Sequence, residues 1–398
     1  MKASATVPCL LLVLVIAGCP QNETPVIAEP PAGQPPEEPM PAEPGPAEAP
    51  ETVVRFAWLS TDGKLMLLDA DAMEATPADI DVSPGEQISW SEDGSVVAAM
   101  GSDDQVYRID LKTGESVEVG PPTTAFMRTF VVSPDGTRVA QLRDDVISVW
   151  ADGETTEIAG PRSCNVPSWS VDSQRLAIGA MGEEEESDGG LWIWDGEGDA
   201  TQVVPAADGW GCTCEIMWSP DGQMLAWARG AGDGWTGDLA RADGSGLRRD
   251  VIGAGPIAWL PDGSGLLVSV HIEAGAFGAG IYRLADGTLA RIGDEEWGGH
   301  AALSPDGARV LAWGYDGRAL MVDVATDEAR TWREDLHITQ AAWAPDGRLA
   351  LVIGGNDEAS QLWIGDADGT EAGRIPVEAD WRWDGRWIEL PADAAVLP

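Results

Sequence analysis

The pentapeptide Trp218-Ser219-Pro220-Asp221-Gly222 is followed at once by the apolar residues Met224-Leu225-Ala226-Trp227. In such a segment proline presets φ for a tight turn, aspartate caps the turn with its carboxylate, and glycine takes the positive φ that ends it. A large apolar residue before the turn and an apolar run after it are typical of two antiparallel strands. The segment therefore predicts a β-hairpin.

This hairpin signal occurs eight times, and successive aspartates are between 37 residues (Asp135 to Asp172) and 49 residues (Asp172 to Asp221) apart. Repeats of this length are typical of four-stranded propeller blades. Tryptophan begins six of the eight copies, which indicates a packing slot between neighbouring blades and fits the 19 Trp against 4 Phe and 3 Tyr. The other copies are Trp90-Ser91-Glu92-Asp93-Gly94, Val132-Ser133-Pro134-Asp135-Gly136, Trp169-Ser170-Val171-Asp172-Ser173, Trp259-Leu260-Pro261-Asp262-Gly263, Leu303-Ser304-Pro305-Asp306-Gly307, Trp343-Ala344-Pro345-Asp346-Gly347 and Trp381-Arg382-Trp383-Asp384-Gly385.

The two ends of the repeat array complement each other. Asp62-Gly63 lies 31 residues before Asp93, the offset at which a complete blade has its turn between the second and third strands. Residues 56–60 and 64–69 are therefore predicted to be the second and third strands of a blade that lacks its first. At the other end, residues 380–385 carry the first-strand motif without enough following chain for a blade.

We therefore predict an all-β fold, an eight-bladed β-propeller of four-stranded antiparallel blades over residues 53–398. Strands from the N-terminal and C-terminal ends would share one blade and close the ring, which removes the exposed sheet edges that favour aggregation. The alternative is a seven-bladed ring with an extra terminal hairpin.

The Ser-Pro-Asp-Gly turns and apolar strands, such as Arg348-Leu349-Ala350-Leu351-Val352, resemble the WD-repeat-like β-propellers of the TolB family. The resemblance covers roughly residues 53–390 and implies the propeller fold. The separate N-terminal α/β domain of TolB has no counterpart here between the N-terminal segment and the first strand. Propellers of this type also occur beside peptidase domains, but this sequence has no Gly-x-Ser-x-Gly elbow followed by Asp and His.

The N-terminus resembles that of a bacterial lipoprotein. Lys2 precedes the short apolar run 10–16, and Ile16-Ala17-Gly18-Cys19 resembles a lipobox, so residues 1–18 are predicted to be a signal peptide. The resemblance implies that Cys19 carries the lipid anchor. The alternative is an ordinary secretory signal with an incidental cysteine.

Residues 19–52 are predicted to form a disordered tether after the lipidated cysteine. They are rich in Pro, Ala, Gly and Glu and contain little that can be buried. Extended toward polyproline II at about 3 Å per residue, this segment would reach up to ~100 Å. The expected location is extracytoplasmic and membrane-bound through the anchor, and in a Gram-negative cell Pro20 in place of Asp favours the outer membrane, facing the periplasm.

Charge narrows the range of partners. The formal net charge is −43 and the sequence pI is near 4.1. This balance opposes the phosphate neutralisation on which nucleic-acid binding depends, and it opposes adhesion to anionic lipid by charge alone. We expect no nucleic-acid partner. Cationic peptides, metal ions and basic protein surfaces are electrostatically compatible.

Candidate site residues fall on the propeller face that carries the loops leading into the first strands and the turns between the second and third strands. Three histidines map to this face in three successive blades, so a Zn²⁺ or Mn²⁺ site is one hypothesis, against surface or packing roles. Tryptophans outside the motif position are candidates for a ligand or partner surface. The histidines are His271, His300 and His337, the last two also being candidates for the partner surface, and the tryptophans are Trp210, Trp297 and Trp332.

The same face is predicted to carry an acidic loop and two cysteines. Residues 183–188 read Glu-Glu-Glu-Glu-Ser-Asp and are either a solvated loop or a site for a cation or basic partner. Cys164 and Cys214 enter adjacent blades at nearly equal height, so they are candidates for a disulfide in an oxidising compartment. That pairing leaves Cys212 over, and a Cys-x-Cys redox or metal pair of Cys212 and Cys214 is the alternative.

Taken together, these features favour a non-catalytic, membrane-anchored binding or scaffolding protein for an envelope protein, peptide or glycan. No cofactor is expected in this interpretation, and the propeller is expected to be monomeric. A second hypothesis is a metal-assisted lyase or hydrolase that uses the three histidines. A third is a TolB-like role in envelope integrity. The sequence carries no phosphate-binding loop, nucleotide fingerprint or His-Glu-x-x-His helix.

Overall fold

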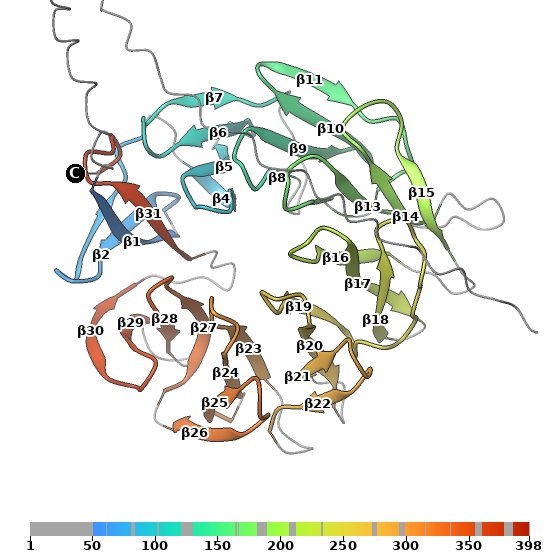
Figure 1. Cartoon of the computed structure of the whole chain (residues 1–398). Coiled ribbons are helices and arrows are strands. Elements are labelled where there is room, and N and C mark those ends of the chain that lie inside the picture. The colour runs from blue at the N-terminus through green and yellow to red at the C-terminus, as the bar shows by residue number, and fades with distance from the viewer. Residues whose placement is uncertain are drawn as a thin grey trace, which may run out of the picture. The chain divides into compact units, whose positions relative to one another are not determined.

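The computed structural model describes most of the chain beyond residue 50. The described residues are 51–60, 62–80, 84–101, 103–120, 130–163, 165, 167–180, 189–206, 212–231, 234–272, 277–293, 299–314, 316–334, 336–354, 360–377 and 385–397. Pro50–Pro398 forms one compact unit. Within the described residues all regular elements are strands, and they form eight antiparallel sheets arranged around a centre (Figure 1). The predicted eight-bladed β-propeller is confirmed.

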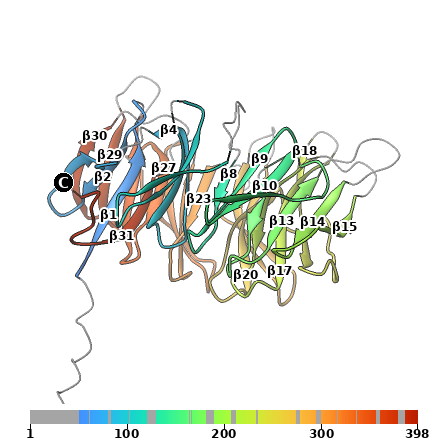
Figure 2. The same ribbon diagram turned by 90° about the horizontal axis from the view of Figure 1, so that it is seen from above.

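Every blade except the one that closes the ring runs from an inner to an outer strand in chain order, and the view in Figure 2 shows the sheets standing side by side around the ring. The first three complete blades are β4 (Pro84–Trp90), β5 (Val96–Gly101), β6 (Val106–Asp110) and β7 (Ser116–Glu118); β8 (Phe130–Val132), β9 (Arg138–Arg143), β10 (Val146–Ala151) and β11 (Glu154–Glu157); and β12 (Ser168–Trp169), β13 (Leu176–Ala180), β14 (Gly190–Trp194) and β15 (Thr201–Pro205).

The next blades continue the ring. They are β16 (Thr213–Trp218), β17 (Met224–Ala231) and β18 (Gly234–Arg241); β19 (Gly255–Trp259), β20 (Gly265–His271), β21 (Phe277–Arg283) and β22 (Leu289–Arg291); β23 (Gly299–Leu303), β24 (Arg309–Gly314), β25 (Ala319–Asp323) and β26 (Ala329–Arg333); and β27 (Ile338–Trp343), β28 (Arg348–Ile353), β29 (Gln361–Asp366) and β30 (Glu371–Pro376).

One blade contains both ends of the ring, and we call it the closing blade. Its strand order is β3 (Glu74–Pro77), β2 (Leu65–Asp69), β1 (Thr52–Leu59) and β31 (Arg386–Pro391). The inner strand β31 comes from the C-terminal end and pairs with β1 in the register Phe56↔Trp387. The predicted sharing of one blade is confirmed, and the seven-bladed alternative is wrong.

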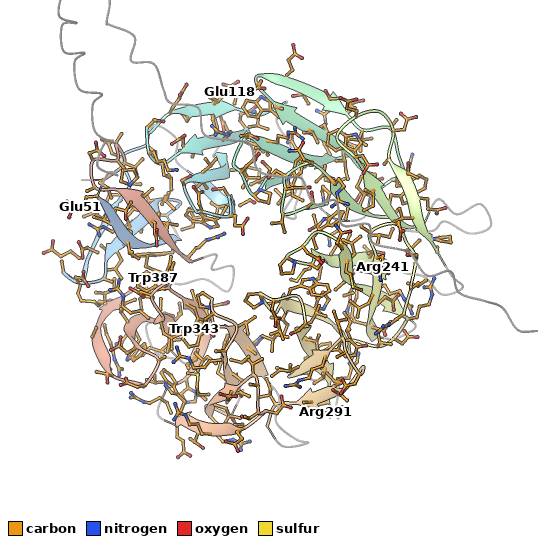
Figure 3. The ribbon with its side chains drawn as sticks, viewed as in Figure 1. Glu51, Glu118, Arg241, Arg291, Trp343 and Trp387 are labelled. Atoms are coloured by element: carbon orange, nitrogen blue, oxygen red, sulfur yellow. The ribbon has the colours of Figure 1, made fainter. Side chains whose placement is uncertain are left out.

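The position of the closing strand differs from the prediction in one respect. The motif at residues 380–385 was expected to form it, but residues 378–384 lie outside the described part of the chain, and the described strand that pairs with β1 begins at Arg386. Trp387 Nε1 donates to the main-chain oxygen of Ala342 over 3.2 Å. In the preceding blade Trp343 makes the same bond to Ala302 over 3.1 Å, so Trp387 occupies the slot that the sequence assigned to Trp381 (Figure 3).

Turn chemistry explains why the motif recurs. Ser219 Oγ donates to Asp221 Oδ1 over 2.6 Å and accepts a bond from the Met224 amide over 2.9 Å. The same carboxylate oxygen accepts a bond from the Gln223 amide over 3.0 Å, and Gly222 has φ +65°. Serine and aspartate thus satisfy the main-chain groups of the turn and fix the register of the hairpin.

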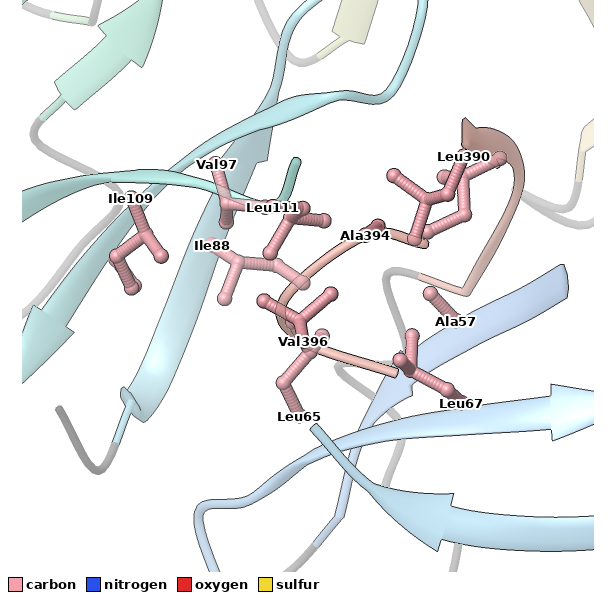
Figure 4. Packing of buried hydrophobic residues seen from close by; sticks show 12 residues of the cluster. Ala57, Leu65, Leu67, Ile88, Val97, Ile109, Leu111, Leu390, Ala394 and Val396 are labelled. Atoms are coloured by element: carbon pink, nitrogen blue, oxygen red, sulfur yellow. The ribbon is translucent and has the colours of Figure 1, made fainter. Parts of the chain in front are cut away.

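Most of the core lies between blades. In the cluster shown in Figure 4, Leu65 and Leu67 of the closing blade pack with Ile88 and Ile109 of the next blade, together with Leu390 of β31. Leucine and isoleucine side chains alternate toward these interfaces because successive residues of a strand point to opposite faces of its sheet. Among the described residues, no helix is long and apolar enough to cross a membrane.

The blade of β16–β18 departs from the four-stranded pattern. In the described part of this blade the fourth strand is reduced to a single bridge between Leu239 and Arg248. Beside this bridge Arg229 Nε donates to Asp238 Oδ2 over 2.7 Å, and the Asp238 side chain is fully buried. Main-chain hydrogen bonds from Gly237 and Leu239 of β18, together with this polar network, connect the segment to its blade.

Candidate functional site

A cavity of about 710 Å³ lies toward the axis of the ring. Its walls come from the inner strands β16, β19, β23 and β27, with residues from the ends of the second strands and the starts of the third strands. We call it the axial cavity. These strand ends belong to the face that carries the loops into the first strands, so the cavity lies toward the face on which the sequence placed the candidate residues.

Glu215 lines the axial cavity at a β-bulge. The β16–β17 register shifts between Cys214 and Met217, and Glu215 takes φ +52°, a conformation rare for a residue with a side chain. Its Oε2 lies only 2.9 Å from the position that a Cβ on Gly255 of β19 would take, so glycine at 255 leaves room for the carboxylate. Glu215 is exposed as a whole residue, but the cavity wall partly desolvates its carboxyl, which raises the pKa of the carboxyl above its ordinary value of 4.5.

His300 lies on β23, directly opposite Trp313 of β24 in the strand register. The two rings are stacked, with centroids 5.8 Å apart and an interplanar angle of 30°. His300 is exposed as a whole residue, but partial desolvation of its ring lowers the pKa of the imidazole below its ordinary value of 6.5, so the neutral form predominates at pH 7. Both rings line the axial cavity, to which His300 contributes a polar group that can donate and accept hydrogen bonds.

Further aromatic groups extend the lining. Trp235, near the start of β18, is 41% exposed, and Phe277 begins β21. His271 links the two, because its Nε2 donates to the main-chain oxygen of Trp235 over 2.5 Å while its ring packs on Phe277 with centroids 5.0 Å apart. This contact holds the turns of two neighbouring blades together beside the cavity.

A second cavity of about 540 Å³ lies next to the first, and Glu215 lines both. Arg386 of β31 lines this second cavity and donates to the main-chain oxygen of Glu92. Burial lowers the pKa of the Arg386 guanidinium. Tryptophans at the motif position form part of the wall, which is consistent with their predicted role as packing residues: Trp90, Trp169, Trp218 and Trp259.

The three predicted metal ligands are not brought together. His300 is in the axial cavity, His271 is engaged with Trp235 and Phe277, and His337 lies next to Gly317, 3.1 Å from the position of a Cβ there. Within the described ranges, no group of three or more His, Cys, Asp or Glu side chains is placed to hold a metal ion. The three histidines have separate neighbours: Trp235 and Phe277 for His271, Trp313 for His300 and Gly317 for His337.

The tryptophan predictions have mixed outcomes. Trp332 lies on the outer strand β26, where its Nε1 donates to the oxygen of Ala367 over 2.8 Å and its ring packs edge-on against Trp363. It is therefore a packing residue, and its placement on the ligand face is wrong. Trp210, Trp297, the acidic run 183–188 and Cys19 lie outside the described residues.

Cys212 forms a disulfide bond. The sequence-based pairing of Cys164 with Cys214 leaves Cys212 without a disulfide partner. This expectation for Cys212 is wrong. Cys164 and the side chain of Cys214 lie outside what the structure describes. Cys212 immediately precedes β16, and its main-chain oxygen accepts a bond from the Gly230 amide over 3.0 Å.

Sequence reasoning missed Glu215, Trp235, Phe277 and Trp313. Trp235 follows the residues Gly232-Asp233-Gly234 and lies outside the motif position, so the criterion that selected Trp332 applies to it equally. No sequence signal marks Glu215, because its placement depends on the bulge in β16.

The chain was also compared with known proteins. No protein-family model matches it, and no curated protein matches it significantly. Solved structures do match: a eukaryotic initiation factor at 14% identity (81% of this chain, 84% of that chain, TM-score 0.56) and AztD from Citrobacter koseri at 13% identity (85% and 98%, TM-score 0.54). TolB from Acinetobacter baumannii also matches, at 14% identity over 76% of this chain and 81% of that chain, with a TM-score of 0.37 that is too low to support an inference.

Likeness at this level of identity shows the fold alone. The fold and the site together define an eight-bladed β-propeller with a cavity near its axis, and the described residues that line this cavity provide aromatic rings, one carboxylate and one imidazole.

Proposed function

We propose that this chain is a lipid-anchored extracytoplasmic binding protein whose axial cavity takes part of an envelope protein, peptide or glycan without catalysing its conversion. The observation that supports this proposal most is the cavity itself. At about 710 Å³ it is within the range of sites for small ligands and single side chains or sugar rings.

The lining suits recognition. Trp235 and Trp313 provide flat apolar surfaces, and Glu215, His300 and Gln340 provide a few polar groups among them. Apolar walls with a small number of placed polar groups are the usual composition of a binding site. A closed ring of blades also holds these groups in fixed positions, which limits the entropy lost on binding.

The alternatives have less support. A lyase or hydrolase with three histidine ligands would need His271, His300 and His337 around one ion, whereas these residues make separate contacts. A TolB-like role in envelope integrity is compatible with the fold, but no described residue supports this role in particular.

Ligand capture from envelope extracts tests the binding proposal. The immobilised chain is expected to retain a partner, and Trp235→Ala is expected to reduce retention at least about tenfold, the usual effect of losing a central aromatic anchor. Leu289→Ala is a matched control, because Leu289 is 37% exposed on the outer strand β22 and does not line the axial cavity. Equal retention by all three proteins would contradict a role for the cavity.

Lipid anchoring is tested separately. The mature protein is expected to begin with an acylated Cys19 and to sediment with membranes. A Cys19→Ala variant is expected to lose the acyl mass and to accumulate as an unprocessed precursor. A mature N-terminus at any other residue, measured by mass spectrometry, would show an ordinary secretory signal instead.

A further inference from the structure

The charged groups of the axial cavity have one sign. Glu215 is the carboxylate on its wall, and the described residues that line it include neither lysine nor arginine. The chain as a whole carries a formal charge of −43, so its long-range field also attracts cations and repels anions. An anionic ligand would have to enter against this field and find no cation in the described lining.

Aromatic rings lie in the same cavity as the carboxylate. Trp235, Phe277 and Trp313 all line it, and Trp235 is 41% exposed. A cation near the face of an indole or phenyl ring is attracted by the negative charge of the ring face, by about 0.5–1 kcal/mol at a solvent-exposed ring. A carboxylate together with aromatic rings therefore suits an organic cation better than a strongly hydrated metal ion.

The other titratable groups near Glu215 are consistent with a preference of the cavity for an organic cation. In the axial cavity the facing group is His300, whose neutral form predominates at pH 7 because partial desolvation lowers its pKa. In the second cavity the facing groups are Glu92 and Arg386, and Arg386 is engaged with the main-chain oxygen of Glu92. Among the described residues no ion pair involves Glu215, and its Oε2 lies 2.9 Å from the position that a Cβ on Gly255 would take.

From this arrangement we infer that the ligand of the axial cavity carries an organic ammonium group, which binds Glu215 with the aromatic rings of Trp235 and Phe277 around it. This inference rests on the proposed binding function and specifies its ligand. Ammonium groups are found on lysine side chains, peptide N-termini and amino sugars, and the chemistry recognised is the same in each.

Protonation of Glu215 is coupled to such binding. The ammonium group binds the ionised form of the Glu215 carboxyl. Binding therefore lowers the pKa of Glu215 from its raised value and releases a proton wherever the free carboxyl was protonated. Affinity for the cation is therefore expected to be full above the pKa of Glu215 and to fall as the pH is lowered through it. Protonation of His300 in the same direction adds repulsion.

Calorimetric titration of the full chain in detergent with matched probe pairs tests the inference. The pairs are Nα-acetyl-lysine methylamide with its norleucine analogue, and glucosamine with N-acetylglucosamine. In at least one pair the amine is expected to bind about tenfold or more tightly than its neutral analogue. The pair that shows the difference identifies a peptide or an amino sugar as the source of the ammonium group.

Glu215→Gln keeps the size of the side chain and removes its charge. This variant is expected to abolish the preference for the amine and the dependence of affinity on pH, with the fold unchanged by circular dichroism. Glu118→Gln is the matched control, because Glu118 is exposed on the outer strand β7 far from the axis (Figure 3) and the charge change is the same.

The outcomes separate the two proposals. Retention of an envelope partner that depends on Trp235, without an amine preference, would leave the binding function standing and overturn the ammonium inference. An equal preference for the amine in the Glu215→Gln and Glu118→Gln variants would overturn the ammonium inference as well. The carboxylate of Glu215 would then have no particular part in binding the amine. If neither the parent chain nor any variant retained an envelope partner, this result would count against the binding function itself.

Discussion

The indole Nε1 of Trp387 donates a hydrogen bond to the main-chain oxygen of Ala342 over 3.2 Å, and this bond joins the closing blade to the blade before it. Trp169, Trp218, Trp259 and Trp343 make the equivalent bond to the inner strand of their own preceding blades. The ring is thus closed by the same contact that these four blades make with the blades before them.

Replacing Trp387 by phenylalanine removes this bond and keeps an aromatic ring. We expect Trp387→Phe to lower the free energy of unfolding by about 1–2 kcal/mol, because the Ala342 oxygen loses its donor and the smaller ring leaves a void. Chemical denaturation measures the change. Trp343→Phe is expected to have a similar effect, and a neutral Trp387→Phe beside a destabilising Trp343→Phe would show that the closing contact is not equivalent.

The buried carboxylate of Asp238 is expected to contribute more to the stability of the fold than the carboxylate of Asp250. Asp238 is fully buried against Arg229, whereas the side chain of Asp250, which also pairs with Arg229, is 62% exposed. Removing one partner of a buried ion pair costs about 3–5 kcal/mol. We expect Asp238→Ala to approach this cost and Asp250→Ala to cost about 1 kcal/mol or less, as for exposed pairs. Equal costs in thermal denaturation would contradict the assigned roles.

Acid is expected to weaken the motif turns. At Asp93 burial opposes ionisation most strongly, but hydrogen bonds from Ser95 and Ser91 outweigh it and lower the pKa from 3.8 to about 2. A group with a lowered folded-state pKa contributes stability above its unfolded pKa and loses it as the pH falls through the folded pKa. The contribution of Asp93 is therefore complete above about pH 4 and lost near pH 2.

Denaturant titrations at a series of pH values test this expectation. Asp93→Asn is expected to be less stable than the parent chain at neutral pH, and the difference is expected to shrink as the pH approaches 2. A difference that is constant from neutral pH to pH 2 would mean that the Asp93 charge does not stabilise the turn.

The disulfide partner of Cys212 is expected to be Cys164. Ser163 Oγ donates to the Gly179 oxygen over 3.1 Å, and a Cβ on Gly179 would lie 2.7 Å from Thr213 Cβ, so the chain neighbours of the two cysteines meet at Gly179. Peptide mapping without reduction is expected to yield a linked Cys164 and Cys212 peptide. Cys212→Ser is expected to lower stability by about 2–4 kcal/mol. A Cys212–Cys214 link would refute the pairing.

Much of the fold can be predicted from the sequence because the same hairpin motif occurs in it eight times. The turn residues Ser219, Asp221 and Gly222 make local hydrogen bonds, and local chemistry of this kind is visible in a pentapeptide. Closure was also predictable from the offset of Asp62. The identity of the closing strand was not, because Trp387 is recognised by its bond to a residue 45 positions away in the chain.

The site was less accessible to sequence reasoning. The offset of His300 within the repeat predicts the face on which it lies, but whether three histidines meet depends on the tertiary arrangement of three different blades. Glu215 enters the axial cavity because β16 bulges and Gly255 gives it room, and both are tertiary features. Trp332 was misplaced because an outer-strand tryptophan and a loop tryptophan look alike when only their distance from the motif is considered.

The position of β1 has a mechanical consequence. β1 is hydrogen-bonded on both sides, to β31 and to β2. A force applied along the strand at the N-terminal end of β1 would load both ladders of hydrogen bonds in shear at the same time. The closing blade, which contains both ends of the ring, is therefore also the blade that resists such a force.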